Sequence, residues 1–216
     1  MKSLKSYGNR KKCEEKITKV KVNDRKDFSY ELSLIQNDYL KSFAEFCLEH
    51  APDYFYTYPA SKSGEYHPRC SNELYGLTRH TKYCVRLANE LMKDGFLFPF
   101  NDTDKDLIYV TLLLHDLCKW GVGKYKNFLK HGGIAAHYVE ELVQGTEFET
   151  IIKSSAWDTI KMAMRRHLGK YSENAYGLPQ NELELFVARI DYITSLRVQD
   201  EIEDLKNEEL KKENNK

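Results

Sequence analysis

Leu112-Leu113-Leu114-His115-Asp116-Leu117-Cys118-Lys119-Trp120 is the stretch that decides how this chain folds. An apolar run, which should be buried, contains a histidine next to an aspartate and a lysine three residues further on. Burying a carboxylate without a partner is costly, so the pair predicts a compensating cation or donor nearby. Two interpretations fit. Either His115 is a core residue hydrogen-bonded to a neighbouring helix while Asp116 pairs with an arginine, or both bind one metal ion.

The residues before this stretch predict a helix that begins near Thr103 and continues to Trp120. Thr103 can cap the helix, and Asp104 and Asp106 lie in its first turn, where the helix dipole favours negative charge. Adjacent residues on a helix point about 100° apart. The histidine and the aspartate can therefore share a partner only if it lies between their two directions, as a metal ion would.

Composition favours a single soluble domain. The chain has 216 residues, of which 41% are hydrophobic, and its formal net charge is zero, so it has no global nucleic-acid or membrane signature. Five cysteines without a CxxC pair predict reduced thiols in the cytoplasm. The N-terminus is basic without an apolar signal core, and the apolar run at 108–114 is too short to cross a membrane. We therefore expect a cytoplasmic protein that does not bind membranes.

The charge pattern divides the chain into three parts. Residues 1–27 contain ten Lys and Arg against four Asp and Glu, which leaves an excess of six positive charges among few apolar residues. This segment predicts a mobile arm, with a phosphate-contacting arm as the alternative. Residues 28–205 hold the folded domain and residues 206–216 form a charged tail. The chain beyond Arg197 is expected to fray.

Apolar residues at helical spacing predict an all-α fold. Outside 103–120, the expected helices cover 29–50, 73–93, 125–143, 149–167 and a last one from about 181. Residues 51–73 are aromatic and then polar, which predicts a long loop whose aromatic side chains either cover the core or stack on a base. The chain thus predicts a helical bundle of about six to seven helices.

Four ionisable residues lie on the apolar faces of three of these helices. His80 falls within the stripe of the 73–93 helix, and Asp191 lies among apolar positions of the last helix. His115 and Asp116 supply the other two. Neutral imidazoles and carboxylates suit Mn, Fe, Co, Ni or Zn, and one ion would satisfy all four groups. No HExxH, P-loop, GxSxG or cysteine-rich finger competes for this role. The alternative is a helical interaction protein in which each polar group has a local partner.

The order His80, His115-Asp116 and Asp191 resembles the metal-ligand order H…HD…D of the HD-domain phosphohydrolase superfamily. The resemblance covers residues 67–197. It extends to the residues around each ligand, namely Gly76–Thr81, Leu114–Lys119 and Ile190–Tyr192. It implies an all-helical scaffold and hydrolysis of phosphomonoesters or phosphodiesters, usually of nucleotides, at one or two divalent transition metals.

Further residues resemble accessory positions of that family. His131 and His167 match extra histidines that hold a second metal in some members, although two-metal relatives often carry paired histidines where this chain has Arg166-His167. His137 is the alternative ligand on the same predicted helix as His131. His67 resembles a loop histidine of phosphodiesterase-like and exonuclease-like members, which implies a contact with the substrate.

The implied chemistry is attack on phosphorus by a metal-activated water, because a metal lowers the pKa of its bound water from 15.7 to about 7. Asp116 is expected to orient this nucleophile. Lys119, Arg165 and Arg166 are expected to neutralise charge on the phosphoryl oxygens. The expected partner is a nucleotide or another phosphate ester. A 3'-5' exonuclease or phosphodiesterase on RNA, DNA or cyclic nucleotides and a catalytically silent nucleotide-sensing module are the alternatives, and the oligomeric state stays open.

Overall fold

The computed structural model describes residues 27–61, 63–64, 66–93, 100–124, 130–197, 200 and 204–207. This part of the chain is helical and contains no strand, as predicted. Six of its α-helices have twelve or more residues, and the set comprises α3 (Ser29–Ser33), α4 (Asp38–Glu49), α5 (Gly76–Met92), α6 (Asp102–Leu114), α7 (His131–Leu142), α8 (Ser155–Arg166), α9 (Glu173–Tyr176) and α10 (Glu182–Ser195). The basic arm lies outside the described residues except for Asp27, and so does the tail beyond residue 207.

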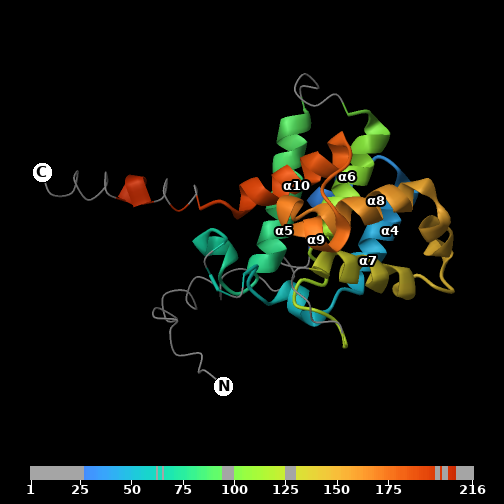
Figure 1. The fold of residues 1–216 in the computed structure, drawn as a ribbon, viewed down its shortest axis with the longest axis horizontal. Coiled ribbons are helices and arrows are strands. Elements are labelled where there is room, and N and C mark those ends of the chain that lie inside the picture. The colour runs from blue at the N-terminus through green and yellow to red at the C-terminus, as the bar shows by residue number, and fades with distance from the viewer. Residues whose placement is uncertain are drawn as a thin grey trace, which may run out of the picture.

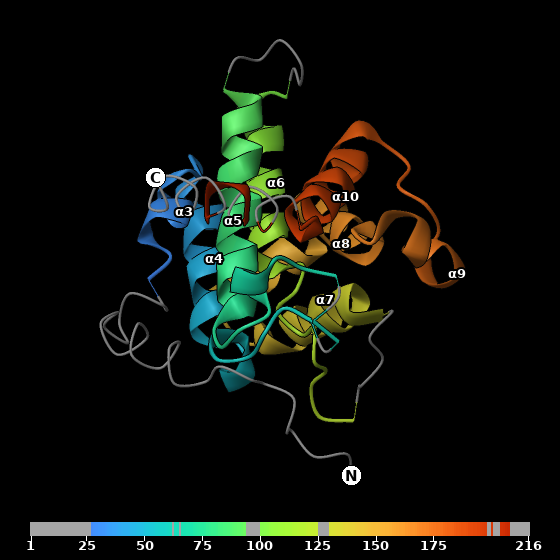
Figure 2. The same cartoon turned by 90° about the vertical axis from the view of Figure 1, so that its left-hand side faces the viewer.

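Helix α6 forms the centre of the bundle. Every residue from Asp106 to Leu114 is buried, and α6 contacts α4, α5, α8 and α10. A helix that is apolar around most of its circumference has to be covered on several sides. Figures 1 and 2 show α5 and α6 side by side, with α10 and α8 packed against them. None of the helices in the described ranges combines the length and the apolar character needed to cross a membrane.

The start and the end of α6 differ from the prediction. Asn101, and not Thr103, caps the helix: its side chain accepts a hydrogen bond from the backbone N–H of Asp104, whose carboxylate accepts one from the N–H of Asn101. The helix ends at Leu114, and residues 115–120 continue as turns with i to i+3 hydrogen bonds. The histidine–aspartate pair therefore follows the last turn of the helix instead of lying inside it.

Two predicted helices are each divided in the structure. The region 29–50 forms α3 and α4, because the Asn37 side chain caps α4 and the Asp106 carboxylate holds the Asn37 backbone N–H. The region 149–167 forms a 3-10 segment, η4 (Glu147–Lys153), followed by α8, which Ser154 caps. Helices α5 and α7 begin later than predicted, at Gly76 and His131.

The predicted loop at 51–73 is shaped by two 3-10 turns, η1 (Asp53–Tyr56) and η2 (Arg69–Ser71). Phe55 and Tyr56 are buried in the core, which favours the core-covering interpretation of the aromatic residues over base stacking. This segment packs on α5, and a Cβ atom at Gly76 would clash with the backbone carbonyl of η2. The loop is therefore held at a fixed place beside the first turns of α5.

The C-terminal region is anchored further than predicted. Asp200 is 6% exposed, and its carboxylate accepts hydrogen bonds from the backbone N–H of Arg69 at 2.9 Å and from Nε of Arg197 at 3.0 Å. The expectation of fraying directly after Arg197 was wrong at this position, because a buried carboxylate needs such donors and the loop supplies one of them.

Candidate metal centre

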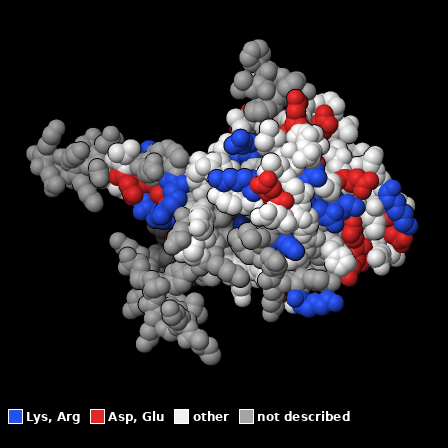
Figure 3. Space-filling view, in the orientation of Figure 1, with Lys and Arg blue, Asp and Glu red and all other residues white. Residues whose placement is uncertain are grey.

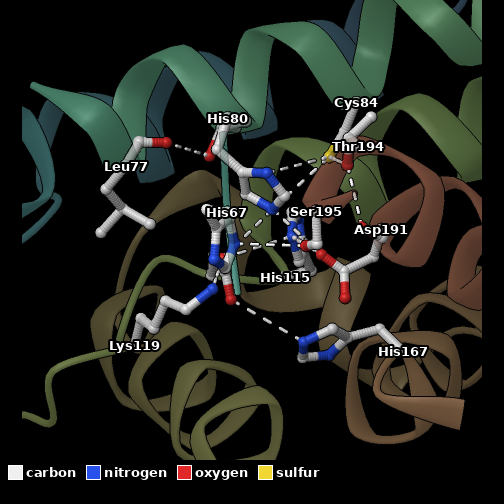
Figure 4. Close-up of polar contacts among 12 residues, drawn as sticks. His67, Leu77, His80, Cys84, His115, Lys119, His167, Asp191, Thr194 and Ser195 are labelled. Atoms are coloured by element: carbon white, nitrogen blue, oxygen red, sulfur yellow. Dashed lines mark hydrogen bonds and ion pairs between the residues drawn. The ribbon is translucent and has the colours of Figure 1, made fainter. Parts of the chain in front are cut away.

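Six buried ionisable side chains meet at one place in the bundle. They are His80 on α5, His115 and Asp116 after α6, His131 at the start of α7, His167 after α8 and Asp191 on α10. Figure 4 shows His80, His115, His167 and Asp191 around this place. Each of the six is at most 7% exposed. Because each lies on the inner face or at the end of its helix, packing of the helices brings all six together.

Asp191 connects the first pair of histidines. Its Oδ1 atom lies 3.0 Å from Nε2 of His80 and 3.6 Å from Nε2 of His115. These three side chains come from α5, the turn after α6, and α10, which are far apart in the sequence. Their nitrogen and oxygen atoms are close enough to bind one ion.

The Asp116 carboxylate lies between two groups of histidines. Its Oδ2 atom is 3.6 Å from Nε2 of His80 and 3.5 Å from Nε2 of His115. Its Oδ1 atom is 2.8 Å from Nε2 of His131 and 3.7 Å from Nε2 of His167. The Nε2 atoms of His131 and His167 are themselves 2.9 Å apart. One carboxylate oxygen therefore faces each pair of imidazoles, which is the arrangement of a carboxylate that bridges two metals.

Backbone carbonyls orient two of the rings. Nδ1 of His115 donates to the carbonyl of Leu112 at 2.7 Å, and Nδ1 of His167 donates to the carbonyl of Met164 at 2.6 Å. This assigns the proton to Nδ1 and turns the Nε2 lone pair toward the cluster. Nε2 of His115 is buried and has no hydrogen-bond partner among the described residues. A divalent metal would satisfy this atom, and imidazole nitrogen with carboxylate oxygen is a donor set that such metals accept.

Both carboxylates of the cluster are held in their ionised form. Burial acts to raise the pKa of Asp116, but the Lys119 ammonium and His115 outweigh it and hold this pKa well below its usual range. Burial acts the same way on Asp191, but the neighbouring imidazoles of His115 and His80 outweigh it and hold this pKa well below its usual range. The cluster therefore presents two anionic carboxylates, as metal ligands must be.

The histidines are not all shifted in the same direction. Burial lowers the pKa of His80, and it lowers the pKa of His167 to about 3 with help from the neighbouring histidines. Burial also acts to lower the pKa of His115, but the adjacent carboxylates outweigh it and the pKa is raised. His80 and His167 are therefore neutral at pH 7, whereas His115 is the ring on which the carboxylates favour positive charge.

Lys119 lies within the cluster. Its Nζ atom donates to Oδ2 of Asp116 at 2.6 Å, and the residue is 5% exposed. The three-residue separation and the i to i+3 turn between them place the two side chains on the same side of the backbone. The structure thus shows a buried cation next to the ligand set, and a contact between Lys119 and a substrate phosphate stays a prediction.

The predicted basic contacts at the end of α8 face other groups. Arg166 donates to both carboxylate oxygens of Glu184, at 2.9 and 3.1 Å, and to the backbone carbonyl of Tyr176 at 3.0 Å. The guanidinium of Arg165 lies over the Tyr176 ring, 5.7 Å from its centre. These two arginines therefore have contacts that join α8 to α9 and α10. Nε of Arg165 is buried without a hydrogen-bond partner among the described residues, and a phosphate contact of either arginine stays a prediction.

The choice between the two histidines of α7 is settled by their burial. His131 is 1% exposed and reaches Asp116, whereas the His137 side chain is 45% exposed and lies 3.2 Å from Glu141 one turn further on. Residues six positions apart lie on different faces of a helix. His131, and not the alternative His137, is the histidine that the fold brings to the cluster.

His67 lies beside the cluster, and its predicted contact with a substrate stays a prediction. It is 5% exposed, its ring packs edge-on against the ring of His80, and its Nε2 atom is 3.2 Å from Oγ of Ser195 (Figure 4). Burial, followed by the charge of Lys119, lowers the pKa of His67 to about 2. This ring is therefore neutral, and it packs directly against a residue of the cluster.

Cys84 is a member of the cluster that the sequence analysis missed. Its Sγ atom lies 3.6 Å from Nε2 of His80 and 3.1 Å from Oγ1 of Thr194. The available signal was its position four residues after His80 on the same predicted apolar stripe, because residues i and i+4 are neighbours on one helix face. Burial is the main reason that the pKa of this thiol is raised well above its usual value.

Comparison with known proteins agrees with this geometry. The family model of the HD domain matches residues 77–196, which is 120 of the 216 residues, and this span contains all six residues of the cluster as well as Cys84 and Lys119 but not His67. Searches of curated proteins and of solved structures gave no match. HD domains bind divalent metals and are generally hydrolases. The match covers more than half of the chain, and the chain therefore belongs to the HD-domain family.

Proposed function

We propose that this protein is a metal-dependent phosphohydrolase that acts on a nucleotide phosphomonoester or phosphodiester. The observation that carries the proposal is the Asp116 carboxylate, which places one oxygen beside His80 and His115 and the other beside His131 and His167. A core made only for stability would not gather so many buried ionisable groups, since each is costly to desolvate.

Two positions for divalent metals follow from these distances. His80, His115, Asp116 and Asp191 would hold the first ion, and Asp116, His131 and His167 would hold the second. The donors suit Mn, Fe, Co, Ni or Zn. Metals bound in this way lower the pKa of coordinated water to about 7 and polarise phosphoryl oxygens.

The chain's own residues supply orientation and charge. Asp116 would fix the two halves of the site relative to each other. The Lys119 ammonium, already desolvated, would bind a phosphoryl oxygen and neutralise the charge that develops there, because a fixed charge in a dry site acts more strongly than in water. His67, neutral and beside His80, would donate a hydrogen bond to the substrate at the open edge of the cluster.

A small nucleotide is the substrate that the surface favours. On the face drawn in Figure 3, blue Lys and Arg side chains alternate with red Asp and Glu side chains over the described residues, so that face has no continuous basic track for a polymer. The net charge of the whole chain is zero. An exonuclease or phosphodiesterase acting on RNA, DNA or cyclic nucleotides is the second candidate, favoured by the excess of six positive charges in residues 1–27.

The free thiols of the described cysteines support a cytoplasmic location.

The test combines metal analysis with turnover. Purified protein is analysed for bound metals, then assayed with bis-p-nitrophenyl phosphate, a panel of nucleotides, and short RNA and DNA, each with added Mn. We expect bound metal and hydrolysis, and Asp116→Ala should abolish both. Asp158→Ala is the matched control, because this carboxylate lies on the surface of α8 with its side chain 70% exposed.

The outcomes distinguish a hydrolase from a nucleotide-sensing module and from a protein without a metal site. Bound metal without turnover of any phosphate ester would identify a nucleotide-sensing module, provided that a nucleotide still binds. Protein without metal, or a fully active Asp116→Ala variant, would refute the metal-dependent hydrolase and leave a helical protein with internally paired polar groups.

A further inference from the structure

Cys84 lies where a ligand of the first metal would lie. The residue is fully buried on α5, one turn after His80, and its sulfur points toward the cluster, next to Thr194 of α10 (Figure 4). One donor atom from each of His80, Cys84, His115 and Asp191 can be chosen so that all four lie within 4.8 Å of one another. These four residues therefore fill a volume of the size of one coordination sphere.

The distances agree with a shared ion. Zinc binds sulfur at about 2.3 Å and imidazole nitrogen at about 2.0–2.1 Å, so two such donors at a tetrahedral angle lie about 3.5 Å apart. The observed separation of Cys84 Sγ and His80 Nε2 is 3.6 Å. A second observation points to the same place: His115 Nε2 is buried, faces this group and has no hydrogen-bond partner within the described part of the chain.

Thr194 can serve both protonation states of the sulfur. Its Oγ1 atom lies 3.1 Å from Cys84 Sγ and 2.9 Å from each of the backbone carbonyls of Ile190 and Asp191. With a thiol, the S–H group donates to this hydroxyl, which itself donates to a carbonyl. When a metal displaces the thiol proton to solvent, the hydroxyl can rotate and donate to the thiolate. A ligand supported by such a hydrogen bond is a usual feature of metal sites.

We propose that the Cys84 thiolate is a ligand of the metal position formed by His80, His115 and Asp191, and that it makes this position selective for zinc over Mn²⁺ and Mg²⁺. The proposal rests on the metal centre of the proposed function and adds the donor that decides which metal occupies it. Thiolate favours zinc, whereas carboxylate and water ligands alone suit Mn²⁺ and Mg²⁺.

The experiment uses the full chain, stripped of metal and reconstituted with Co²⁺ as a spectroscopic substitute for zinc. We expect a thiolate-to-cobalt charge-transfer band in the near ultraviolet. Cys84→Ala should lose this band and bind zinc about 10–100-fold more weakly or worse, with Mn²⁺ affinity unchanged. Cys47→Ala is the matched control, because Cys47 is also buried but lies on α4 in the hydrophobic core. This control should keep both the band and the zinc affinity.

X-ray absorption on the zinc-loaded natural protein tests the same point without any substitution, so the proposal stays testable if Cys84→Ala does not fold. A sulfur neighbour at about 2.3 Å is expected. Zinc surrounded by nitrogen and oxygen alone, together with a cobalt form that lacks the band, would overturn the role of Cys84. If such a protein still hydrolyses phosphate esters, the proposed function stands. A chain that binds no metal refutes both proposals, and the metal analysis reveals this first.

Discussion

Replacing Asp116 by Asn in the metal-free protein should strongly destabilise the fold. The change keeps the shape of the side chain but removes the negative charge that faces the Lys119 ammonium at 2.6 Å. Solvent screens this pair little, since Lys119 is 5% exposed and Asp116 is fully buried. Leaving one member of a buried pair uncompensated costs about 3–5 kcal/mol. For a chain of this size each kcal/mol lowers the melting temperature by about 2–4 °C, so we expect a decrease of about 6–20 °C.

Replacing the other member of the pair, Lys119→Met, should lower the free energy of unfolding by less. It leaves the Asp116 carboxylate 3.5 Å from Nε2 of His115, and this ring, whose pKa the adjacent carboxylates already raise, can take up a proton in place of the lysine charge. In the double variant, Asp116→Asn with Lys119→Met, both charges are absent, so no unpaired charge is left buried. The coupling free energy between the two residues should therefore be about 2 kcal/mol or more, toward the upper part of the range for residues in contact.

Urea unfolding in the presence of a chelator, followed by circular dichroism, measures all four members of this cycle. The exposed pair Asp102 and Lys105, 3.2 Å apart on the surface of α6, provides the matched control cycle and should show a coupling close to zero. A coupling for the buried pair below about 0.5 kcal/mol would refute the argument. It would mean that Lys119 is not the counter-ion that makes the buried Asp116 tolerable without metal.

Three further predictions concern packing, pH and the N-terminal arm. Gly132→Ala should lower the melting temperature and the metal content, because its Cβ would clash with the backbone carbonyl of Met164 and push α7 away from α8. Gly133→Ala should do so far less, since its Cβ would meet the far end of the Tyr176 side chain and no backbone atom, and equal losses would contradict this reasoning. Burial lowers the pKa of His67 to about 2 in the folded protein, whereas an unperturbed histidine has a pKa of about 6.5, so between these pH values only the unfolded chain binds this proton. Stability should therefore fall by about 1.4 kcal/mol for each pH unit below 6.5 through this group, and His67→Gln should remove that slope in urea titrations of the metal-free protein. Deleting residues 1–27 should leave mononucleotide hydrolysis unchanged, and a salt-dependent loss of RNA or DNA cleavage would favour a polymer substrate instead.

Much of the candidate site follows from local rules that the sequence contains by itself. Helical spacing places His80 on the same face as its apolar neighbours, and such a face has to be buried. The same argument applies to Asp191. The order of these residues around His115-Asp116 is the pattern on which the family resemblance depends, and the family match confirmed it. All-helical architecture was predictable for the same reason, because apolar periodicity is a property of each segment alone.

Helix boundaries depended on partners that are distant in the sequence. The Asp106 carboxylate divides the first predicted helix by binding the backbone next to α4, at a separation of 69 residues along the chain. The tight turn after Leu114 places His115 and Asp116 beyond α6, although their apolar context predicted helix. At the first of these places local propensity is overridden by a hydrogen bond that exists only once the bundle is assembled. The turn after Leu114 is instead held by i to i+3 backbone hydrogen bonds.

The chemical detail of the centre was decided by tertiary structure alone. The sequence favoured His131 and kept His137 as the alternative ligand, and packing of α7 against α8 buried only His131. The fold placed Glu184 beside Arg166, whose phosphate contact stays a prediction. Cys84 became a candidate ligand because the fold brings His115 and Asp191 to the face of α5 that carries His80 and Cys84. Such contacts join segments that are far apart along the chain, so no local pattern records them, whereas the inward face of each helix is fixed by its own sequence.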